Sequence, residues 1–377
     1  MKIAIDARLY GLENAGLGRY IMNLVQELTR IDRKNKYLIL LRKNYYDTLT
    51  FPDNWKKIQA DFRHYTLKEQ LLLPLLLYRH WPDLVHFPHF NVPVLYLRRF
   101  VVTIHDLIMH KFEDEGTTTL PRRLHQIRRI GYKISFSFAV MRASKIIVPS
   151  NEVKNEVYKY YPTINVDKIV CTYEGVTDKY KANIAPEKIV KKYGLHKPYL
   201  VYFGNAYPHK NLPFLIKGLK ELNKKGKKVY LLISTPRSVF AERLRKMIEN
   251  NQMENCVNFP GFIPDEELSG ILRDSLGFIY PSLLEGFGLQ GLEALSSGTL
   301  VLASDIPVFR EIYKNKVLYF DPQKTESLVY AIKKAVDMNQ DERDVWIKQG
   351  KEFVKNYSWS KMAKETLGVY EKSSDSL

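Results

Sequence analysis

The sequence predicts an α/β protein made of two doubly wound domains, each a parallel sheet with helices on both faces. Short apolar runs typical of buried strands alternate with helical patterns along most of the 377 residues. The alternation restarts near residue 195, and a chain of this length has room for two domains. Ligands of such sheets bind beyond the carboxyl ends of the strands, so two facing domains predict a cleft between them.

The first half of the chain carries the strands and helix of the first predicted domain. A helix follows the first strand because Ile21, Leu24, Val25 and Leu28 recur at i, i+3, i+4 and i+7. The buried strands are predicted at Ile3–Ile5, Tyr37–Leu41, Leu84–Phe87, Val101–Ile104 and Ile146–Val148.

The pattern then repeats in the second half. A polar segment, Asp178–Pro198, is interpreted as a linker, and a helix is predicted over Leu212–Leu222. Strands are predicted at Tyr199–Phe203, Val229–Ile233, Val257–Phe259, Phe278–Tyr280 and Leu300–Ala303.

The bulk composition limits the class of partner and of compartment. The formal net charge of +17 favours an anionic partner, which is nucleic acid, an anionic membrane surface or a phosphorylated substrate. The two cysteines, Cys171 and Cys256, are too few for a disulfide scaffold, fit a reducing compartment and show no metal-ligand spacing.

Neither a signal peptide nor a membrane-spanning segment is predicted. The first residues, Met1–Asp6, have the pattern of a strand that reaches an acid at once. The longest apolar run, Leu71–Leu77, is interrupted by Pro74 and is far shorter than the roughly 20 residues of a spanning helix. We therefore expect a cytoplasmic protein, or one that is peripheral on the inner face of the cell membrane.

The most informative stretch is Pro281–Ala294, which places two carboxylates, Glu285 and Glu293, on either side of a glycine-rich turn that opens a helix. A helix start offers backbone N–H groups and the positive end of the helix dipole, which suit a phosphate. Carboxylates beside it accept hydrogen bonds from hydroxyl-rich groups. Sugar and phosphate together predict a sugar nucleotide as ligand.

Three further segments lie after predicted strands. Gly16–Arg19 follows the first strand, His105-Asp106 ends the Val101–Ile104 strand, and Gly204–Asn211 follows Tyr199–Phe203. Glycines allow close backbone approach to a ligand, His105 can move a proton near neutral pH, and Lys210 can neutralise a diphosphate. The alternative interpretations are a plain strand-to-helix turn, a capping pair and a solvated lysine.

The run from Gly116 to Ile147 contains seven Lys or Arg and no Asp or Glu. In a helix Arg122, His125, Arg129 and Lys133 share one face, and Leu124, Ile127, Ile134 and Phe138 line another. Such a basic amphipathic helix can lie on an anionic bilayer, and the alternative is a surface helix with a solvated basic face.

Together these motifs resemble family 4 of the retaining glycosyltransferases, which have the GT-B fold of two facing Rossmann-like domains. Glu285 and Glu293 match the family's Glu-x7-Glu motif within a Pro-Ser-x-x-Glu-Gly-Phe-Gly-Leu context. The resemblance continues through Gly298–Ser304, Glu311 and Leu318–Pro322. Matching places are also occupied by Gly16–Arg19, His105-Asp106 and Lys210-Asn211.

The resemblance implies roles for individual residues. Glu293 would bind the ribose, Glu285 the transferred sugar, and Lys210 the leaving diphosphate, so that His105, Glu285 and Lys210 are the expected catalytic residues. The acceptor or membrane side would involve Arg122, Arg129 and Lys133. No metal and no cofactor are expected beside the nucleotide-sugar substrate. The expected donor-binding residues are Gly16, Gly18, Arg19, Asn205, His209, Phe262, Ile263, Phe287, Gly288, Leu289 and Glu293.

The sequence departs from the family pattern in three places. His209 stands where the family commonly has arginine, which replaces a permanent charge by one expected to titrate near neutrality. Gln290-Gly291 replaces a commoner proline, which bears on the sugar loop and on donor identity. Ser234–Pro236 lacks glycines that often follow that strand.

The resemblance also implies a domain plan and a reaction. Residues 1–190 would form the acceptor-side domain, 191–358 the nucleotide-sugar domain, and 359–377, with Trp359 at its start, a helix that returns to the first domain. The expected reaction is retaining sugar transfer, with GDP-mannose as first guess ahead of UDP- and ADP-sugars, to a hydroxyl of a glycan or lipid-linked acceptor in bacterial polysaccharide or glycolipid assembly.

Two alternatives remain. One is a sugar-nucleotide hydrolase or epimerase, or a phosphorylase-like enzyme, of the same fold. The other is a non-catalytic nucleic-acid-binding protein, which the net charge suggests and the absence of a recognition motif disfavours. We therefore expect no nucleic-acid partner.

Overall fold

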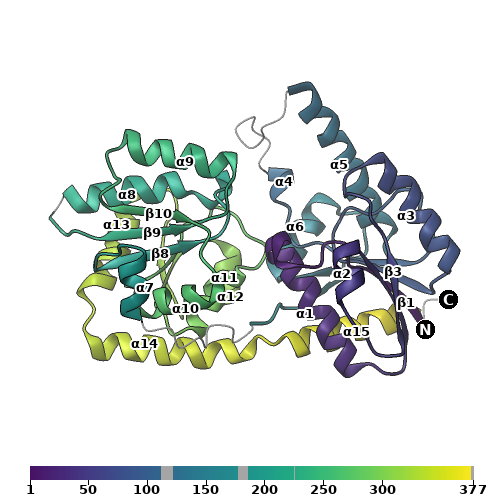
Figure 1. Cartoon of the computed structure of the whole chain (residues 1–377). Helices are drawn as coiled ribbons and strands as arrows, with labels where there is room; N and C mark the ends of the chain where they lie inside the picture. The colour runs from purple at the N-terminus through teal and green to yellow at the C-terminus, as the bar shows by residue number, and fades with distance from the viewer. Residues whose placement is uncertain (112–121, 177–185, 225, 375–377) are drawn as a thin grey trace. The chain divides into compact units, whose positions relative to one another are not determined.

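The computed structural model describes residues 1–111, 122–176, 186–224 and 226–374 (Figure 1). Over these residues the chain forms two compact units. The first unit contains residues 1–107, 122–175 and 358–374. The second contains residues 108–111, 176 and 186–357, with residue 225 left out.

The first unit is built on a seven-stranded parallel sheet of order β3-β2-β1-β4-β5-β6-β7. The order reverses between β1 and β4, where Ile3 pairs with Tyr37 on one side and Leu84 on the other. Doubly wound sheets bind ligands at this reversal. The strands are β1 (Lys2–Asp6), β2 (Lys36–Leu41), β3 (Trp55–Gln59), β4 (Leu84–Phe87), β5 (Phe100–Thr103), β6 (Lys145–Val148) and β7 (Ile169–Cys171).

The two edge strands of this sheet, β3 and β7, are not predicted from the sequence. In β3 only Trp55 and Ile58 are buried, and the lysines between them leave no apolar run. β7 has three residues, of which Ile169 alone is buried. An edge strand meets a neighbour on one side only, so a strong apolar pattern is not required of it.

Helices cover the sheet of the first unit. Ile21, Leu24, Val25 and Leu28 of the first helix are buried, as their spacing predicts. Pro74 lies inside a helix and does not interrupt the run Leu71–Leu77. The helices are α1 (Ala15–Ile31), α2 (Lys43–Thr48), α3 (Leu67–His80), α5 (Arg122–Arg142), α6 (Asn151–Tyr160) and α15 (Trp359–Ser374), with 3-10 turns η1 (Leu12–Asn14) and η3 (Val166–Lys168).

Helix α15 packs against α1 and the sheet of the first unit. At its start the buried Trp359 lies against Gly175. A Cβ atom on Gly175 would come within 2.1 Å of the backbone nitrogen of Trp359. Further along, the Tyr370 hydroxyl lies 2.6 Å from Nδ1 of His86 on β4. Nε2 of His86 is 2.8 Å from the Thr103 hydroxyl, so this buried imidazole joins three elements of the unit.

The second unit is built on a six-stranded parallel sheet of order β10-β9-β8-β11-β12-β13. The order reverses between β8 and β11, where Val201 pairs with Phe278. The strands are β8 (Tyr199–Phe203), β9 (Tyr230–Ser234), β10 (Val257–Gly261), β11 (Gly277–Tyr280), β12 (Val301–Ser304) and β13 (Leu318–Phe320).

The helices of the second unit begin earlier in the chain than the sequence predicts. Part of the supposed linker Asp178–Pro198 is helix α7, and Lys192 and the Tyr193 hydroxyl both contact Glu267 of α10 at 2.7 Å. Residues 177–185 lie outside the described residues. The helices are α4 (Ile108–Lys111), α7 (Pro186–Lys192), α8 (Leu212–Lys224), α9 (Val239–Asn250), α10 (Asp265–Asp274), α11 (Leu289–Ser296), α12 (Pro307–Tyr313), α13 (Thr325–Asp337) and α14 (Gln340–Phe353), with η4 (Pro208–Lys210) and η5 (Val354–Asn356).

The buried Tyr370–His86 contact generates a stability prediction. Tyr370→Phe removes the hydroxyl and leaves a ring nitrogen of the buried His86 without that partner, which should lower the free energy of unfolding by about 1–3 kcal/mol. Native-state hydrogen exchange should show the loss of protection in α15 and β4. Tyr330→Phe, at a side chain that is 70% exposed, is the matched control. Unchanged protection in α15 would contradict the prediction.

Candidate active site

The loops that follow β8 and β11 lie at the carboxyl ends of two adjacent parallel strands. The first loop ends in η4 and in Asn211, whose φ of 57° places it in the left-handed region. The backbone N–H of Leu283 in the second loop donates to the His209 carbonyl at 2.8 Å. Both loops therefore flank the reversal of strand order, where a ligand site is expected, and are joined to each other.

Lys210 and Glu285 meet between these loops. The Lys210 Nζ donates to Glu285 Oε1 at 2.5 Å, and the two side chains are only 11% and 10% exposed. Nζ also lies 5.4 Å from the ring centroid of Tyr280. The sequence predicts both residues as site residues but not their direct contact, because 75 positions separate them in the chain.

The charge of Glu285 is set by competing effects. Burial raises the pKa of this carboxyl, whereas Lys210 and His209 lower it, and the net pKa lies below its ordinary value. Around it, burial and the neighbouring carboxylate raise the pKa of the Tyr202, Tyr280 and Tyr313 hydroxyls well above their usual range. At neutral pH the centre is therefore an ion pair among neutral phenols.

The expectation that His209 titrates near neutrality is wrong. Its ring is buried, and burial together with the Lys210 charge lowers the pKa of His209 to about 4. The histidine is neutral near pH 7 and titrates in acid, not near neutrality. The centroid of its ring lies 5.9 Å from that of Tyr207, and the two rings are stacked.

Glu293 lies on α11, one turn beyond the helix start, as the sequence predicts. Its side chain is buried, with 1% of the residue exposed. The N-cap residue is Gly288, at a φ of 94°, and no side chain caps the helix. The first turn of α11, which begins at Leu289 shortly after Glu285 in the chain, therefore offers the positive end of its dipole, which suits an anion.

Tyr313 of α12 holds the start of α11 in place. Its hydroxyl donates to the Gly288 carbonyl. A Cβ atom on Gly288 or Gly291 would come within 2.4 Å or 2.3 Å of that hydroxyl. Glycine is therefore required at both positions by the approach of one tyrosine, and Gly291 has a packing role that the sequence does not reveal.

Gln290 has a structural contact in place of the proline that the family pattern favours. Its Nε2 donates to the Phe203 carbonyl at the end of β8 at 3.1 Å. Gly204, at a φ of 139°, leaves the space, since a Cβ atom there would lie 2.6 Å from Gln290 Nε2. This side chain ties α11 to the β8 loop that carries Lys210.

The remaining predicted donor residues of the second unit are placed around these loops. Phe262 is 69% exposed after β10, whereas Ile263 is buried and its N–H donates to the Ser234 hydroxyl at 3.1 Å. Phe287 is buried edge-on against Tyr357. The Asn205 carbonyl accepts from the Tyr202 hydroxyl at 2.7 Å, and Leu289 opens α11 half-buried.

In the first unit, Gly16, Gly18 and Arg19 lie inside the first turns of α1, not in a turn before it as predicted. The 3-10 turn η1 makes the entry to the helix instead. Gly18 is required by packing, because a Cβ atom there would lie 1.8 Å from the Gly11 carbonyl oxygen. Nothing lies within 4 Å of a Cβ atom placed on Gly16, and Arg19 is half-buried.

His105 follows β5 and is held from both ring nitrogens. Nε2 lies 3.0 Å from the Pro88 carbonyl oxygen and Nδ1 lies 3.4 Å from Glu174 Oε1. The ring stands edge-on to Tyr20, with centroids 4.7 Å apart. The side chain is 18% exposed, and Glu174, which orients it, is a residue that the sequence does not single out.

Two family models match the chain. The model described as "Glycosyltransferase Family 4" matches residues 15–180, and "Glycosyl transferases group 1" matches residues 186–353. The chain belongs to family 4 of the glycosyltransferases. It is an enzyme of the retaining hexosyltransferase class.

Curated relatives agree with this assignment. The chain is 28% identical to "O-antigen chain mannosyltransferase RfbU" of Salmonella typhimurium over 245 residues, which is 65% of this chain and 62% of that relative. That match spans less than two thirds of the relative. The chain is 25% identical to "O-antigen chain mannosyltransferase B" of Escherichia coli over 98% of its own length and 99% of the relative.

Solved structures show the fold. Sucrose-phosphate synthase from Thermosynechococcus elongatus has a TM-score of 0.76 at 18% identity, covering 99% of this chain and 98% of that one. Anabaena Alr3699/HepE in complex with UDP and glucose has a TM-score of 0.75 at 14% identity, covering 99% and 100%. These likenesses confirm the predicted GT-B class with two parallel-sheet α/β domains.

The first unit of this glycosyltransferase contains a buried ionic network that the sequence does not predict. Arg8, just beyond β1, contacts Asp6 Oδ2 and Glu69 Oε1 at 2.7 Å each, and both Arg8 and Glu69 are essentially inaccessible. Asn91 donates to the other Glu69 oxygen at 2.7 Å. With its partners satisfied, this network is a structural tie between β1, α3 and the loop after β4.

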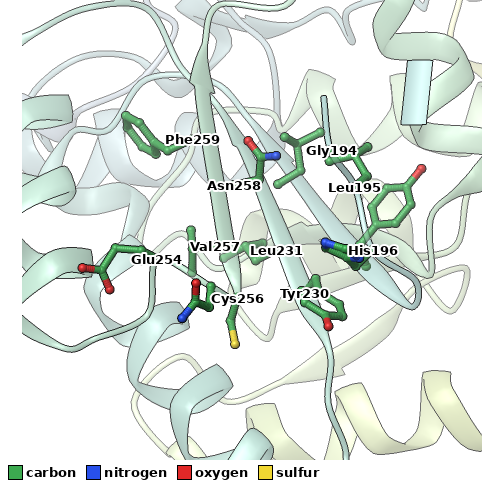
Figure 2. A pocket seen from close by; sticks show the side chains of 13 residues that line it. Gly194, Leu195, His196, Tyr230, Leu231, Glu254, Cys256, Val257, Asn258 and Phe259 are labelled. Atoms are coloured by element: carbon green, nitrogen blue, oxygen red, sulfur yellow. The ribbon is translucent and has the colours of Figure 1, made fainter. Parts of the chain in front are cut away.

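One pocket lies at the opposite end of the second sheet from the ion pair. Tyr199, Tyr230 and Val257, at the amino ends of β8, β9 and β10, line it together with His196 and the half-buried Cys256 (Figure 2). It is therefore separate from the loops that carry Lys210 and Glu285. Among the described residues, no group of three or more His, Cys, Asp or Glu is arranged to hold a metal ion.

The Lys210–Glu285 pair generates a pH prediction. Lys210→Met removes the largest influence that lowers the pKa of Glu285, so burial should raise that pKa above its ordinary value. In the wild type the pKa of Glu285 is lower in the folded than in the unfolded state. The carboxylate therefore adds to the free energy of unfolding above its unfolded-state pKa, and this contribution is lost as pH falls through the folded-state pKa. In Lys210→Met the folded-state pKa of Glu285 is raised, so the free energy of unfolding falls as pH rises through that pKa.

The difference in unfolding free energy between wild type and Lys210→Met should therefore widen as pH rises above the ordinary pKa range of a carboxyl group. Urea denaturation at a series of pH values measures it. Lys217→Met, at an exposed lysine of α8, is the matched control and should show a difference that does not change with pH. A constant difference for Lys210→Met as well would contradict the assignment.

Proposed function

We propose that this family 4 enzyme transfers mannose from GDP-mannose, with retention of the anomeric configuration, to a hydroxyl group of a glycan or lipid-linked acceptor. The observation that supports it most is the buried Lys210–Glu285 ion pair beside the start of α11. The choice of mannose rests on the two relatives whose names are O-antigen chain mannosyltransferases.

The proposed roles follow from the geometry of the second unit. Lys210 and the first turn of α11 offer positive charge for the diphosphate, and Glu285 offers acceptor oxygens for hydroxyls of the transferred sugar. Glu293, buried on the same helix, would accept hydrogen bonds from the ribose. His105 and the first turns of α1 would act on the donor from the first unit.

In the proposed reaction the bond between the anomeric carbon and the diphosphate oxygen breaks and the acceptor hydroxyl oxygen bonds to the same face of that carbon. The acceptor proton passes to the leaving diphosphate. The transition state is stabilised when the negative charge that develops on the leaving oxygen is neutralised. Lys210 has this role in the proposed reaction. Glu285 holds the sugar and is not required as a base.

The role of Glu293 is tested by donor binding. Glu293→Gln keeps the size of the side chain and removes its charge, so GDP affinity should fall roughly tenfold to hundredfold, the range expected for a hydrogen bond to a charged group. Calorimetric titration measures the affinity for GDP, and thermal stabilisation by GDP, UDP and ADP compares the bases. Glu326→Gln on α13 is the matched control. Unchanged GDP affinity would refute the role.

The role of Lys210 is tested by turnover. Lys210→Met should lower kcat by about 10²–10³-fold, the range found when one donor to a developing anion is removed, with a smaller change in KM. Mannose transfer and GDP release are followed together with and without an acceptor glycan. Full kcat in the variant would contradict the proposal, and GDP release by the wild type at full rate without acceptor would favour a hydrolase.

A further inference from the structure

The side chain of His105 is held from three directions within the first unit. Its two ring nitrogens face Pro88 and Glu174, and the ring of Tyr20 lies edge-on to it. Pro88 follows β4, His105 follows β5 and Glu174 follows β7, so these residues meet at the carboxyl ends of three strands of one parallel sheet. Ligands of such sheets bind at this edge, so the orientation of His105 bears on the chemistry of the site.

The contact with Pro88 determines where the imidazole carries its hydrogen. Nε2 of His105 lies 3.0 Å from the Pro88 carbonyl oxygen, and a carbonyl oxygen can only accept a hydrogen bond. Nε2 must therefore carry a hydrogen and donate it. Nδ1 is then the only ring nitrogen that can gain a proton.

Nδ1 of His105 faces a carboxylate that is nearly buried. Glu174 Oε1 lies 3.4 Å from Nδ1, and the Glu174 side chain is only 9% exposed. Among the described residues, His105 is the only ion-pair partner of Glu174. A proton taken up on Nδ1 would therefore lie between the ring and this carboxylate. Both ring nitrogens are thus engaged within the protein.

The backbone that carries Glu174 is itself fixed. The N–H of Thr172 donates to the Val148 carbonyl at 2.9 Å, which continues the sheet pairing just beyond β7. On the other side of Glu174, a Cβ atom on Gly175 would come within 2.1 Å of the backbone nitrogen of Trp359. Residue 175 therefore lies tightly against the start of α15. The carboxylate is directed by a short segment that is held at both ends.

Tyr20 of α1 restricts the ring of His105 from a third side. The two ring centroids lie 4.7 Å apart, and the ring planes are inclined by 82°. The Tyr20 hydroxyl lies 3.2 Å from the Thr103 hydroxyl, which in turn lies 2.8 Å from Nε2 of His86. The phenol therefore hydrogen-bonds away from His105, and its ring limits rotation of the imidazole by packing alone.

We propose that Glu174 is a positioning residue for sugar transfer, and this role rests on the proposed function. Through Nδ1 it fixes the ring of His105, which then acts on the donor in one orientation and does not take the proton of the acceptor hydroxyl. The proposed reaction sends that proton to the leaving diphosphate. The two contacts of His105 agree with this route, because they engage both ring nitrogens.

Steady-state kinetics with GDP-mannose test the role. Glu174→Leu removes the contact at Nδ1, so kcat should fall about tenfold to hundredfold, the order expected when a catalytic group is misplaced by about 1 Å, with little change in KM. Glu174→Gln keeps the length of the side chain and a polar group opposite Nδ1, so it should restore kcat to within about threefold of the wild type.

The matched control is Glu27→Leu on α1. The Glu27 side chain is 12% exposed and pairs with Arg30 at 3.1 Å, so its burial and its cationic partner resemble those of Glu174. Both leucine variants should lower the melting temperature slightly, but only Glu174→Leu should lower kcat. Full kcat in Glu174→Leu, or equal kcat in Glu174→Leu and Glu174→Gln, would overturn the proposal.

A double-mutant cycle separates positioning from a general loss of structure. In a His105→Gln background, Glu174→Leu should cause no further loss of kcat, because Glu174 acts through the ring of His105. Losses that add across the cycle would instead show that Glu174 acts independently of His105, and the proposal would fail.

A measurement on the protein without donor keeps this proposal distinct from the proposed function. Nitrogen-15 NMR of labelled histidine, assigned with His105→Gln, should show the hydrogen of His105 on Nε2 in the wild type and more than one ring environment in Glu174→Leu. A hydrogen on Nδ1 alone in the wild type would contradict the proposal. If the wild type does not turn over GDP-mannose, the proposed function fails, while this NMR result still supports or overturns the orientation of His105.

Discussion

The Lys210–Glu285 ion pair is the interaction on which the rest of the site depends. Both side chains are about nine-tenths buried, so each charge is tolerable only because the other is 2.5 Å away. The pair joins the loops after β8 and β11, and the Leu283–His209 backbone bond joins them again. Gln290 adds a tie from α11 to the end of β8. These hydrogen bonds hold the loops after β8 and β11 together and so restrict the positions of both charged groups.

The charges around Glu285 bear on how an anionic donor would bind. His209 is neutral and the tyrosines around Glu285 are protonated, so Lys210 is the cation closest to the carboxylate at the centre. In the proposed reaction the diphosphate would share or take over Lys210, and Glu285 would then turn its oxygens to the sugar hydroxyls. The mutual contact of Lys210 and Glu285 fixes the positions of both groups that the proposed reaction requires.

The sequence predicts the buried strands and the position of Glu293 well, because apolar runs and the glycine before α11 are local signals. It does not predict the edge strands β3, β7 and β13, because an edge position demands little apolar pattern and β7 and β13 have only three residues each. Nor does it predict that Gly16 and Gly18 lie within α1, or that the pKa of His209 falls to about 4, because entry through η1 and burial depend on contacts made by distant residues. The Arg8–Asp6–Glu69 network and the contact of Tyr313 with Gly288 have the same long-range origin.

The run Leu71–Leu77 shows how one sequence feature changes meaning in the fold. As a linear segment it is too short to span a bilayer, and no described helix is long and apolar enough to cross one. Folded as α3, the run divides its side chains, because Leu73 and Leu77 enter the core while Leu71 and Leu75 face outward.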